Sequence, residues 1–303
     1  MLPRGNAATP HFHFMAILLD TNARILVQGA GGGYGQAQLD GMRAAGGRVV
    51  ALVSPGRGGT RVGDLPVFDT APEAVAATGA DTSALYVPPL GVRDALVENA
   101  DAGIRLCMVA AEYVPLHDSM RGLAHARERG MWVVGPNCVG MASPGRSALG
   151  SFPPAWIMPG PVGLMGRSGT LTLFTARLLT RAGIGQTSCI SMGGDVVIGR
   201  NPAEYLREFL ADPETRVVAA LGEIGGGKEY EMLDLIAGAA KPVATLIVGR
   251  HAPAGQRMGH AGALVGSDRD SAGAKRAALR EAGAHVADSP FHLVEIVKGL
   301  LGA

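Results

Sequence analysis

The sequence reads Ile25-Leu-Val-Gln-Gly-Ala-Gly-Gly-Gly-Tyr-Gly35 near its beginning, an apolar run that passes directly into a glycine cluster. The run is typical of a buried strand, and residues 36–45 after the glycines are expected to form a helix. Glycines at such a turn let backbone N–H groups approach an anion, because a side chain would block the contact. The stretch therefore predicts a βαβ unit with an anion site, and a turn without a ligand is the alternative interpretation.

Apolar runs of strand length alternate with helical stretches along the whole chain, which predicts parallel sheets with helices on both faces. In the first half the expected strands lie at 25–28, 49–53, 84–87, 106–110 and 132–134. In the second half they lie at 162–165, 188–192, 217–221 and 243–248. Residues 135–160 are rich in Gly, Pro and Ser without a clear period, as expected at a boundary. We predict an α/β protein with two doubly wound domains.

Length and composition narrow the class of protein. The 303 residues suffice for two domains with their own cores, and although 47% of them are hydrophobic, the apolar runs are too short for a membrane span. The 27 Lys and Arg and 26 Asp and Glu are interspersed, so no nucleic-acid surface is indicated. Three widely spaced cysteines suggest no metal site and fit a cytoplasmic protein. Residues 1–14 lack periodicity and are expected to be a disordered extension.

The loop after the second expected strand indicates which kind of ligand the first glycine-rich turn binds. It reads Ser54-Pro-Gly-Arg57-Gly-Gly, whereas an NAD site would need an acidic residue at the end of this strand to bind the ribose. An arginine in a glycine-rich loop suits a phosphate instead. Arg57 therefore indicates a phosphorylated ribose or a pyrophosphate, which coenzyme A and NADP both contain. A solvated surface charge is the alternative interpretation of Arg57.

A second candidate anion site follows a strand in the second half, where the sequence reads Gly166-Arg-Ser168-Gly169-Thr170. Hydroxyl groups and small residues lie where a helix begins and its first N–H groups lack partners. N-capping by Ser168 alone would explain the same spacing. The motif has no lysine after it and is not a P-loop, so it gives no indication that this chain binds ATP by itself.

Glu223 and His260 are the candidate catalytic residues. Glu223 follows an apolar strand and is flanked by glycines, and His260 lies between small residues in the late loop Arg257-Met-Gly-His-Ala-Gly262. A neutral imidazole is a nucleophile near physiological pH, and a carboxylate bonded to its other nitrogen fixes the tautomer. A single histidine is more often a structural loop residue, so it is the combination of the two motifs that favours catalysis.

Taken together, these motifs resemble the alpha subunit of succinyl-CoA synthetase and its relatives, the ADP- or GDP-forming acid–CoA ligases. The resemblance runs from residue 17 to about 301, and its most specific segments are 54–60, 135–138, 167–171, 222–226 and 257–262. It implies a Rossmann-like CoA-binding domain, which we place at residues 15–145, and a flavodoxin-like ligase domain at 146–303. The ligase domain would carry a phosphohistidine.

The resemblance also implies roles for individual residues. Coenzyme A would be bound by Gly31, Gly32, Gly33, Tyr34, Arg57, Ala110, Ala111 and Glu112. His260 would be phosphorylated, Glu223 would be its hydrogen-bonding carboxylate, and the phosphate would be cradled by Ser168, Gly169 and Thr170. A beta subunit with an ATP-grasp domain would supply ATP or GTP with Mg²⁺, and a small carboxylic acid would be the substrate.

Departures from the family pattern concentrate around the expected acyl site. Gly166 replaces a serine, Val139 a proline and Leu173 a tyrosine, and residues 195–199 read Asp-Val-Val-Ile-Gly where the family has Asp-Pro-Ile-Pro-Gly. Leucine in place of tyrosine removes a polar group and leaves room for apolar substance, so we expect Leu173 to contact an acid other than succinate. Two alternatives are an NADP-dependent oxidoreductase and a CoA-binding paralogue without catalytic activity.

Overall fold

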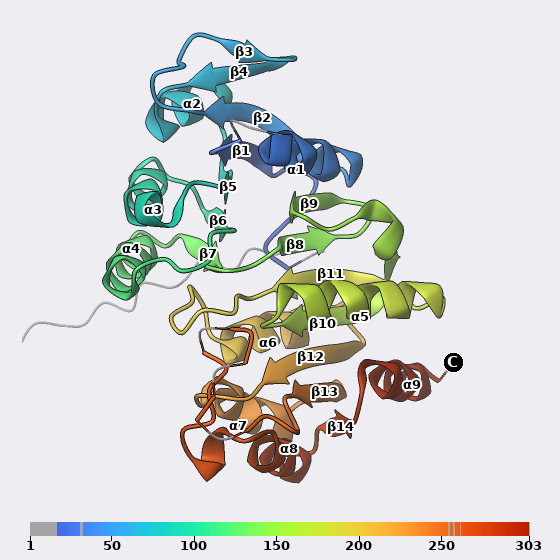
Figure 1. The fold of residues 1–303 in the computed structure, drawn as a ribbon. Coiled ribbons are helices and arrows are strands. Elements are labelled where there is room, and N and C mark those ends of the chain that lie inside the picture. The colour runs from blue at the N-terminus through green and yellow to red at the C-terminus, as the bar shows by residue number, and fades with distance from the viewer. Residues whose placement is uncertain (1–16, 31–32, 254, 257, 261, 303) are drawn as a thin grey trace, which may run out of the picture.

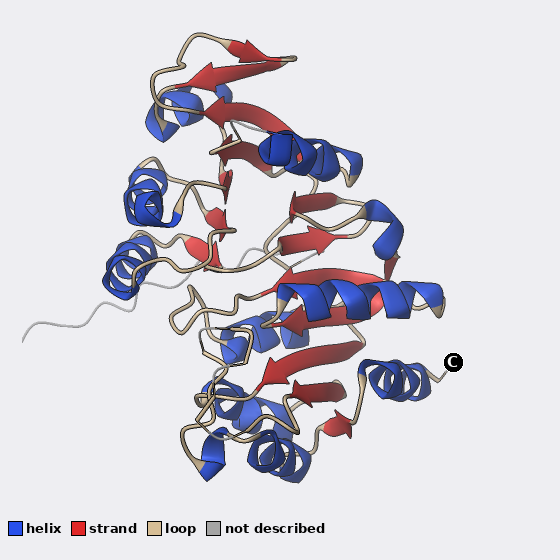
Figure 2. Cartoon of the chain, in the orientation of Figure 1, coloured by secondary structure: helices blue, strands red, loops and turns tan. Residues whose placement is uncertain are grey.

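The computed structural model describes residues 17–30, 33–253, 255–256, 258–260 and 262–302 (Figure 1). The expected extension at residues 1–14 lies outside this range. Two sheets follow one another along the molecule, the first from the blue and green part of the chain and the second mainly from the yellow and red part. Figure 2 shows that helices flank both sheets. Among the described residues, no helix is both long enough and apolar enough to cross a bilayer.

The first sheet has the strand order β3-β4-β2-β1-β5-β6-β7 and is parallel except at its edge strand β3. Its strands are β1 (Arg24–Gln28), β2 (Arg48–Val53), β3 (Arg61–Val62), β4 (Leu65–Phe68), β5 (Thr82–Leu85), β6 (Leu106–Val109) and β7 (Trp132–Val134). Without β3, this order is that of the doubly wound dinucleotide-binding fold. The Rossmann-like prediction is therefore confirmed.

Side chains that alternate along β1 separate two apolar layers. Leu26 lies in a buried cluster with residues of α2 (Ala71–Thr78), α3 (Val92–Asp101) and α4 (Leu116–Glu128). Ile25 and Val27 belong to another cluster, which includes residues of α1 (Gly33–Ala44). Because successive strand residues point to opposite faces, this alternation buries both sides of the sheet.

The second sheet has the order β14-β13-β12-β10-β11-β8-β9. Its strands are β8 (Gly140–Ser143), β9 (Ser147–Gly150), β10 (Pro159–Gly166), β11 (Gln186–Ser191), β12 (Val217–Glu223), β13 (Val243–Val248) and β14 (His285–Ala287). The five strands β11-β10-β12-β13-β14 are parallel and give the flavodoxin-like order 2-1-3-4-5. The flavodoxin-like prediction is likewise confirmed.

Helices cover both faces of this second sheet. One apolar cluster joins it to α5 (Gly169–Arg181) and α9 (Pro290–Leu301). The other face packs against α6 (Pro202–Ala211), α7 (Leu233–Ala237) and α8 (Ala272–Glu281). Short 3-10 helices lie at Pro89–Gly91, Pro154–Trp156, Lys228–Met232 and Asp268–Asp270.

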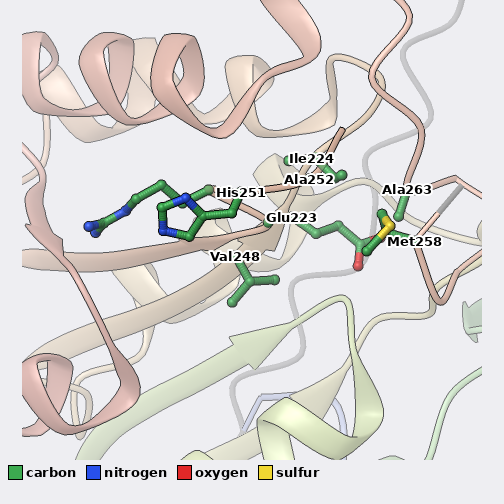
Figure 3. Close-up of a pocket in the computed structure, with 9 residues that line it drawn as sticks. Glu223, Ile224, Val248, His251, Ala252, Met258 and Ala263 are labelled. Atoms are coloured by element: carbon green, nitrogen blue, oxygen red, sulfur yellow. The ribbon is translucent and has the colours of Figure 1, made fainter. Parts of the chain in front are cut away.

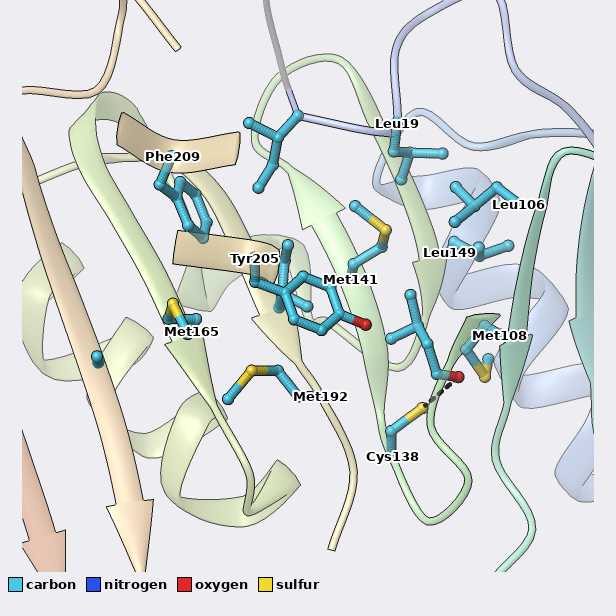
Figure 4. Close-up of a cluster of buried hydrophobic side chains, with 14 of the residues drawn as sticks. Leu19, Leu106, Met108, Cys138, Met141, Leu149, Met165, Met192, Tyr205 and Phe209 are labelled. Atoms are coloured by element: carbon cyan, nitrogen blue, oxygen red, sulfur yellow. Dashed lines mark hydrogen bonds between the residues drawn. The ribbon is translucent and has the colours of Figure 1, made fainter. Parts of the chain in front are cut away.

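The two sheets share one apolar cluster. Figure 4 shows Leu106 and Met108 of the first sheet beside Met141 of the β8–β9 hairpin and Tyr205 of α6. The chain passes from one sheet to the other at residues 135–139, between β7 and β8. The boundary expected between residues 145 and 146 falls in the turn between β8 and β9, and both of these strands belong to the second sheet, where β8 pairs antiparallel with β11.

Candidate active site

The carboxyl ends of β10 and β12 form a crevice in the second sheet. The two strands are paired side by side although β11 and α6 separate them in the chain. β10 continues into α5 on one face, whereas the chain after β12 continues toward α7 on the other. Ligands of open α/β sheets bind at such a switch point, because the diverging chains leave the strand ends uncovered.

Glu223 and His260 meet at this crevice. The His260 Nδ1 atom lies 2.6 Å from Glu223 Oε2, and Glu223 is buried at the end of β12. Gly194 lies directly beneath the imidazole, since a Cβ atom there would come within 2.8 Å of His260 Cγ. The structure therefore brings together the two residues that the sequence singled out, although 37 positions separate them in the chain.

The carboxylate sets the protonation of the imidazole. The hydrogen bond to the Glu223 carboxylate raises the pKa of His260 above the ordinary 6.5, whereas burial and the nearby Arg167 charge lower it. With the carboxylate as acceptor, Nδ1 carries the proton and Nε2 keeps its lone pair. A neutral ring with a free lone pair on Nε2 is the form in which an imidazole can act as a nucleophile.

Three more charged side chains surround Glu223 and are buried: Arg167, Glu229 and Lys275. Arg167 Nη1 lies 3.1 Å from Glu223 Oε1 and 3.9 Å from Glu229 Oε1. Lys275 Nζ lies 2.5 Å from Glu229 Oε2. Two carboxylates thus face two cations, as buried charges require. The sequence assigned none of these three a role.

Ser168, Gly169 and Thr170 lie where α5 begins, beside the same crevice. The Ser168 hydroxyl accepts a hydrogen bond from the Leu171 N–H at 3.3 Å, so it caps the helix. A Cβ atom at Gly169 would lie 2.6 Å from Val139 Cγ1, which shows how closely the chain after β7 approaches this helix end. The capping interpretation is therefore observed, and phosphate binding by the three residues stays a prediction.

Asn137 joins the first domain to the imidazole site. Its N–H donates to Ala111 O at 2.8 Å, its Nδ2 donates to Asp195 Oδ1 at 3.1 Å, and its own carbonyl accepts from the Gly194 N–H at 3.0 Å. Ala110, Ala111 and Glu112 follow β6, and the Glu112 charge contributes to the raised pKa of His260. The loop expected to contact coenzyme A therefore lies next to the histidine.

A cavity of about 560 Å³ opens at the carboxyl ends of β1, β2 and β5. Its lining includes Gly29, Ser54 and Pro55, so it lies where the sequence predicts the ligand of the first turn. Arg57 is exposed in the loop that follows β2. Gly33 begins α1, whereas Gly31, Gly32 and the side chain of Tyr34 lie outside the described residues.

A second cavity, of about 420 Å³, lies beside Glu223 at the ends of β12 and β13 (Figure 3). In this view the Glu223 carboxylate points toward Met258 and Ala263, which flank His260 in the chain. Leu173 is half-buried in α5 and packs against the apolar cluster between that helix and the sheet. A contact between Leu173 and the substrate stays a prediction.

Asp195 and Asn137 are two further residues of the site to which the sequence analysis assigned no role. Asp195 is buried, and desolvation raises the pKa of its carboxyl group, which Asn137 opposes by its hydrogen bond. Both residues lie in segments that the family pattern highlights, but nothing in the local spacing indicates that the segments touch. The Gly-Pro-Asn turn that contains Asn137 indicates a backbone conformation, but it does not indicate which residue the asparagine side chain contacts.

Comparison with known proteins agrees with this geometry. Residues 20–113 match a CoA binding domain family model, and residues 165–285 match a CoA-ligase model. A succinate–CoA ligase [ADP-forming] subunit alpha from Archaeoglobus fulgidus is 44% identical over 95% of this chain and 99% of its own length. The malate–CoA ligase subunit alpha of Methylorubrum extorquens is 42% identical over 91% of this chain and 95% of that one.

Solved structures extend the comparison. The structure of ATP citrate lyase from Methanothrix soehngenii, in complex with citrate and coenzyme A, superimposes with a TM-score of 0.86 at 26% identity. The match covers 95% of this chain but only 51% of that one, so this chain spans about half of the lyase. The curated relatives, by contrast, are matched over nearly their whole length. The chain therefore belongs to the family of the succinate–CoA ligase alpha subunits.

Proposed function

We propose that this chain is the alpha subunit of a carboxylic acid–CoA ligase that forms a nucleoside diphosphate, with His260 as the phosphoryl carrier. The contact of 2.6 Å between His260 Nδ1 and Glu223 Oε2 carries the proposal. The γ-phosphoryl group of ATP or GTP passes to His260 Nε2 and releases the diphosphate. The carboxylate of the acid then takes the phosphoryl group, and the thiol of coenzyme A displaces phosphate to form the thioester.

The chemistry explains why both residues are needed. A carboxylate is a poor electrophile, and phosphorylation gives it a leaving group whose charge fixed dipoles can stabilise. When Nε2 attacks, positive charge develops on the ring, and Glu223 stabilises it through the Nδ1 proton. The Glu223–His260 contact supports this interpretation over a non-catalytic paralogue, and the relatives support it over an NADP-dependent oxidoreductase.

Coenzyme A is assigned to the first domain. The cavity of about 560 Å³ at its strand ends accepts part of the cofactor, and Arg57 in the nearby loop supplies a charge for its phosphates. Asn137 ties Ala111 to the loop beneath His260, so the thiol end can reach the acyl phosphate. The nucleotide and Mg²⁺ are assigned to a beta subunit with an ATP-grasp domain, and the enzyme to the cytoplasm, where the three buried thiols stay reduced.

Phosphoryl transfer to His260 tests the proposal directly. The chain is incubated with its beta subunit, Mg²⁺ and ATP labelled at the γ-phosphate, and the labelled peptide is located by mass spectrometry. We expect a phosphate on His260 that is stable in base and labile in acid, and that returns to ADP when ADP is added. A complex that binds ATP but leaves His260 unlabelled would rule out this mechanism.

The acid is expected to differ from succinate because Leu173 stands where the family has tyrosine. A panel of small carboxylic acids should show another acid with a higher kcat/KM than succinate. A Leu173→Tyr variant should change the preference between the two acids by roughly tenfold, since one altered pocket contact is worth about that much. Leu178→Tyr serves as the control, because Leu178 lies on the same helix and packs against the same cluster. Equal ratios in both variants would remove Leu173 from the acyl site.

A further inference from the structure

Lys275 of α8 is completely buried, and its ammonium group is fully bonded. It donates to the main-chain oxygen of Glu223 at 2.8 Å, to that of Gly225 at 2.8 Å, and to Glu229 Oε2 at 2.5 Å. An ammonium group has three donors, so each is used. Two of the three acceptors belong to the short segment that carries the catalytic carboxylate.

Glu229 holds the same segment from the other side. Its side chain is buried, and its Oε1 atom accepts a hydrogen bond from the Glu223 N–H at 3.3 Å. The main chain of Glu223 is therefore bonded at its N–H by Glu229 and at its carbonyl by Lys275. Glu229 and Lys275 are in turn bonded to each other, which closes the arrangement.

Glycines around Glu223 make this support necessary. A Cβ atom at Gly222 would lie 2.8 Å from Glu229 Cγ, so the glycine lets the Glu229 side chain lie against the strand. Gly225 and Gly226 have positive φ angles of 85° and 59°, and the chain turns away from the sheet there. Ile224 is the one bulky neighbour between these glycines, and the hydrogen bonds from the main chain of Glu223 to the two charged side chains fix the strand end directly.

We propose that Lys275 and Glu229 are positioning residues for the reaction of His260. They hold the main chain of Glu223 from both sides and thereby keep its carboxylate in contact with His260 Nδ1. The kinetic part of this inference rests on the proposed phosphoryl transfer. The structural part, the contact between Glu223 and the imidazole, does not.

The readout is the titration of His260 itself, because its contact with Glu223 is the main cause of its raised pKa. The charged groups around the pair are Arg167 after β10, Lys228 and Glu229 after β12, and Lys275 on α8. The charges of Asp195 and Glu112 also interact with the ring, and both residues stay unchanged in the test.

A Lys275→Met variant of the full chain, with labelled histidine rings, is titrated by NMR, and His260→Asn identifies the resonance. The wild-type imidazole should titrate above 6.5, and the variant should titrate at 6.5 or below, because the Glu223 contact is lost while burial remains. Lys241→Met is the matched control. Lys241 Nζ also bonds to main-chain carbonyls, those of Phe209 and Asp212 at the carboxyl end of α6.

A double variant separates positioning from stability. Lys275→Met with Glu229→Met replaces the buried ion pair by apolar side chains of similar size, which restores stability in many proteins. It does not restore partners for the Glu223 main chain, so the His260 titration should stay low. If either variant titrates as the wild type does, the positioning role is rejected. Should Lys275→Met fail to fold, the double variant alone decides, judged by the same outcomes.

Kinetics of the complex with the beta subunit supply the second readout. The rate of His260 phosphorylation should fall about 100-fold in Lys275→Met, the size expected for a small misplacement of a catalytic group, with an unchanged KM for the nucleotide. Glu231→Gln, an exposed neighbour of Glu229, should leave the rate unchanged. If wild-type His260 accepts no phosphate, the ligase proposal fails, while the titration still decides whether Lys275 positions Glu223.

Discussion

A His260→Asn variant is expected to form no thioester above background and to bind coenzyme A as the wild type does. The substitution removes the Nε2 nucleophile, and loss of a covalent catalytic group costs at least about 10⁴-fold in rate. The asparagine amide can still donate a hydrogen bond to Glu223, so the buried carboxylate keeps a partner. Coenzyme A is assigned to the cavity and loops of the first domain, and only its thiol end approaches residue 260, which is why its Kd should not change. Thioester formation and CoA binding are measured on the same preparation with the beta subunit present.

His285→Asn provides the matched control. His285 is an exposed histidine at the amino end of β14, at the opposite end of the strands from the crevice that holds His260. Its loss should leave thioester formation within about twofold of the wild type, since surface substitutions away from such a site have small effects. Substantial thioester formation by His260→Asn would mean that the phosphoryl group reaches the acid by another route.

An Arg167→Met variant is expected to lose about 3–5 kcal/mol of unfolding free energy, the usual cost of removing one partner of a buried ion pair. Arg167 is 2% exposed and lies 3.1 Å from Glu223 Oε1 and 3.9 Å from Glu229 Oε1. Its removal leaves two buried carboxylates with Lys275 as their remaining buried cation. Denaturant titration of the chain measures the loss from the shift in midpoint.

Two further variants show whether the cause is electrostatic. Arg181→Met, at the exposed end of α5, should change the unfolding free energy by less than about 0.5 kcal/mol. Arg167→Met combined with Glu223→Gln removes one charge of each sign and should recover part of the lost stability. An Arg167→Met protein as stable as the wild type would show that the two carboxylates need no cation there.

The topology could be predicted from the sequence because the central strands are apolar runs with clear ends. The expected strands at 132–134 and 243–248 coincide with β7 and β13. The expected strand at 84–87 lies two residues late, because buried Thr82 and Ser83 begin β5 and read as polar in the sequence. The short strands β8, β9 and β14 were not predicted, since three or four residues give no period to detect.

The contact between Glu223 and His260 could be anticipated from the sequence, whereas the residues that bond to Glu223 could not. Glu223 and His260 each carry a local signal, a functional side chain framed by glycines. Lys275 lies in a helix whose sequence, Ala-Gly-Ala-Lys-Arg, reads as an ordinary helix with a solvated lysine. Its partner Glu223 is 52 residues away, and only the folded chain shows the contact. A residue whose role depends on contacts with distant parts of the chain shows no local motif in a single sequence.

The apolar cluster that both sheets share limits how the two domains can move. Opening the molecule between β7 and β8 would expose side chains such as Met108, Met141 and Tyr205 to water, at a cost of about 25 cal/mol for each Å² uncovered. We therefore expect the two domains to unfold in a single transition rather than to open about a hinge. The distance between the proposed thiol site and the proposed phosphoryl carrier is accordingly fixed by side chains packed in the protein interior.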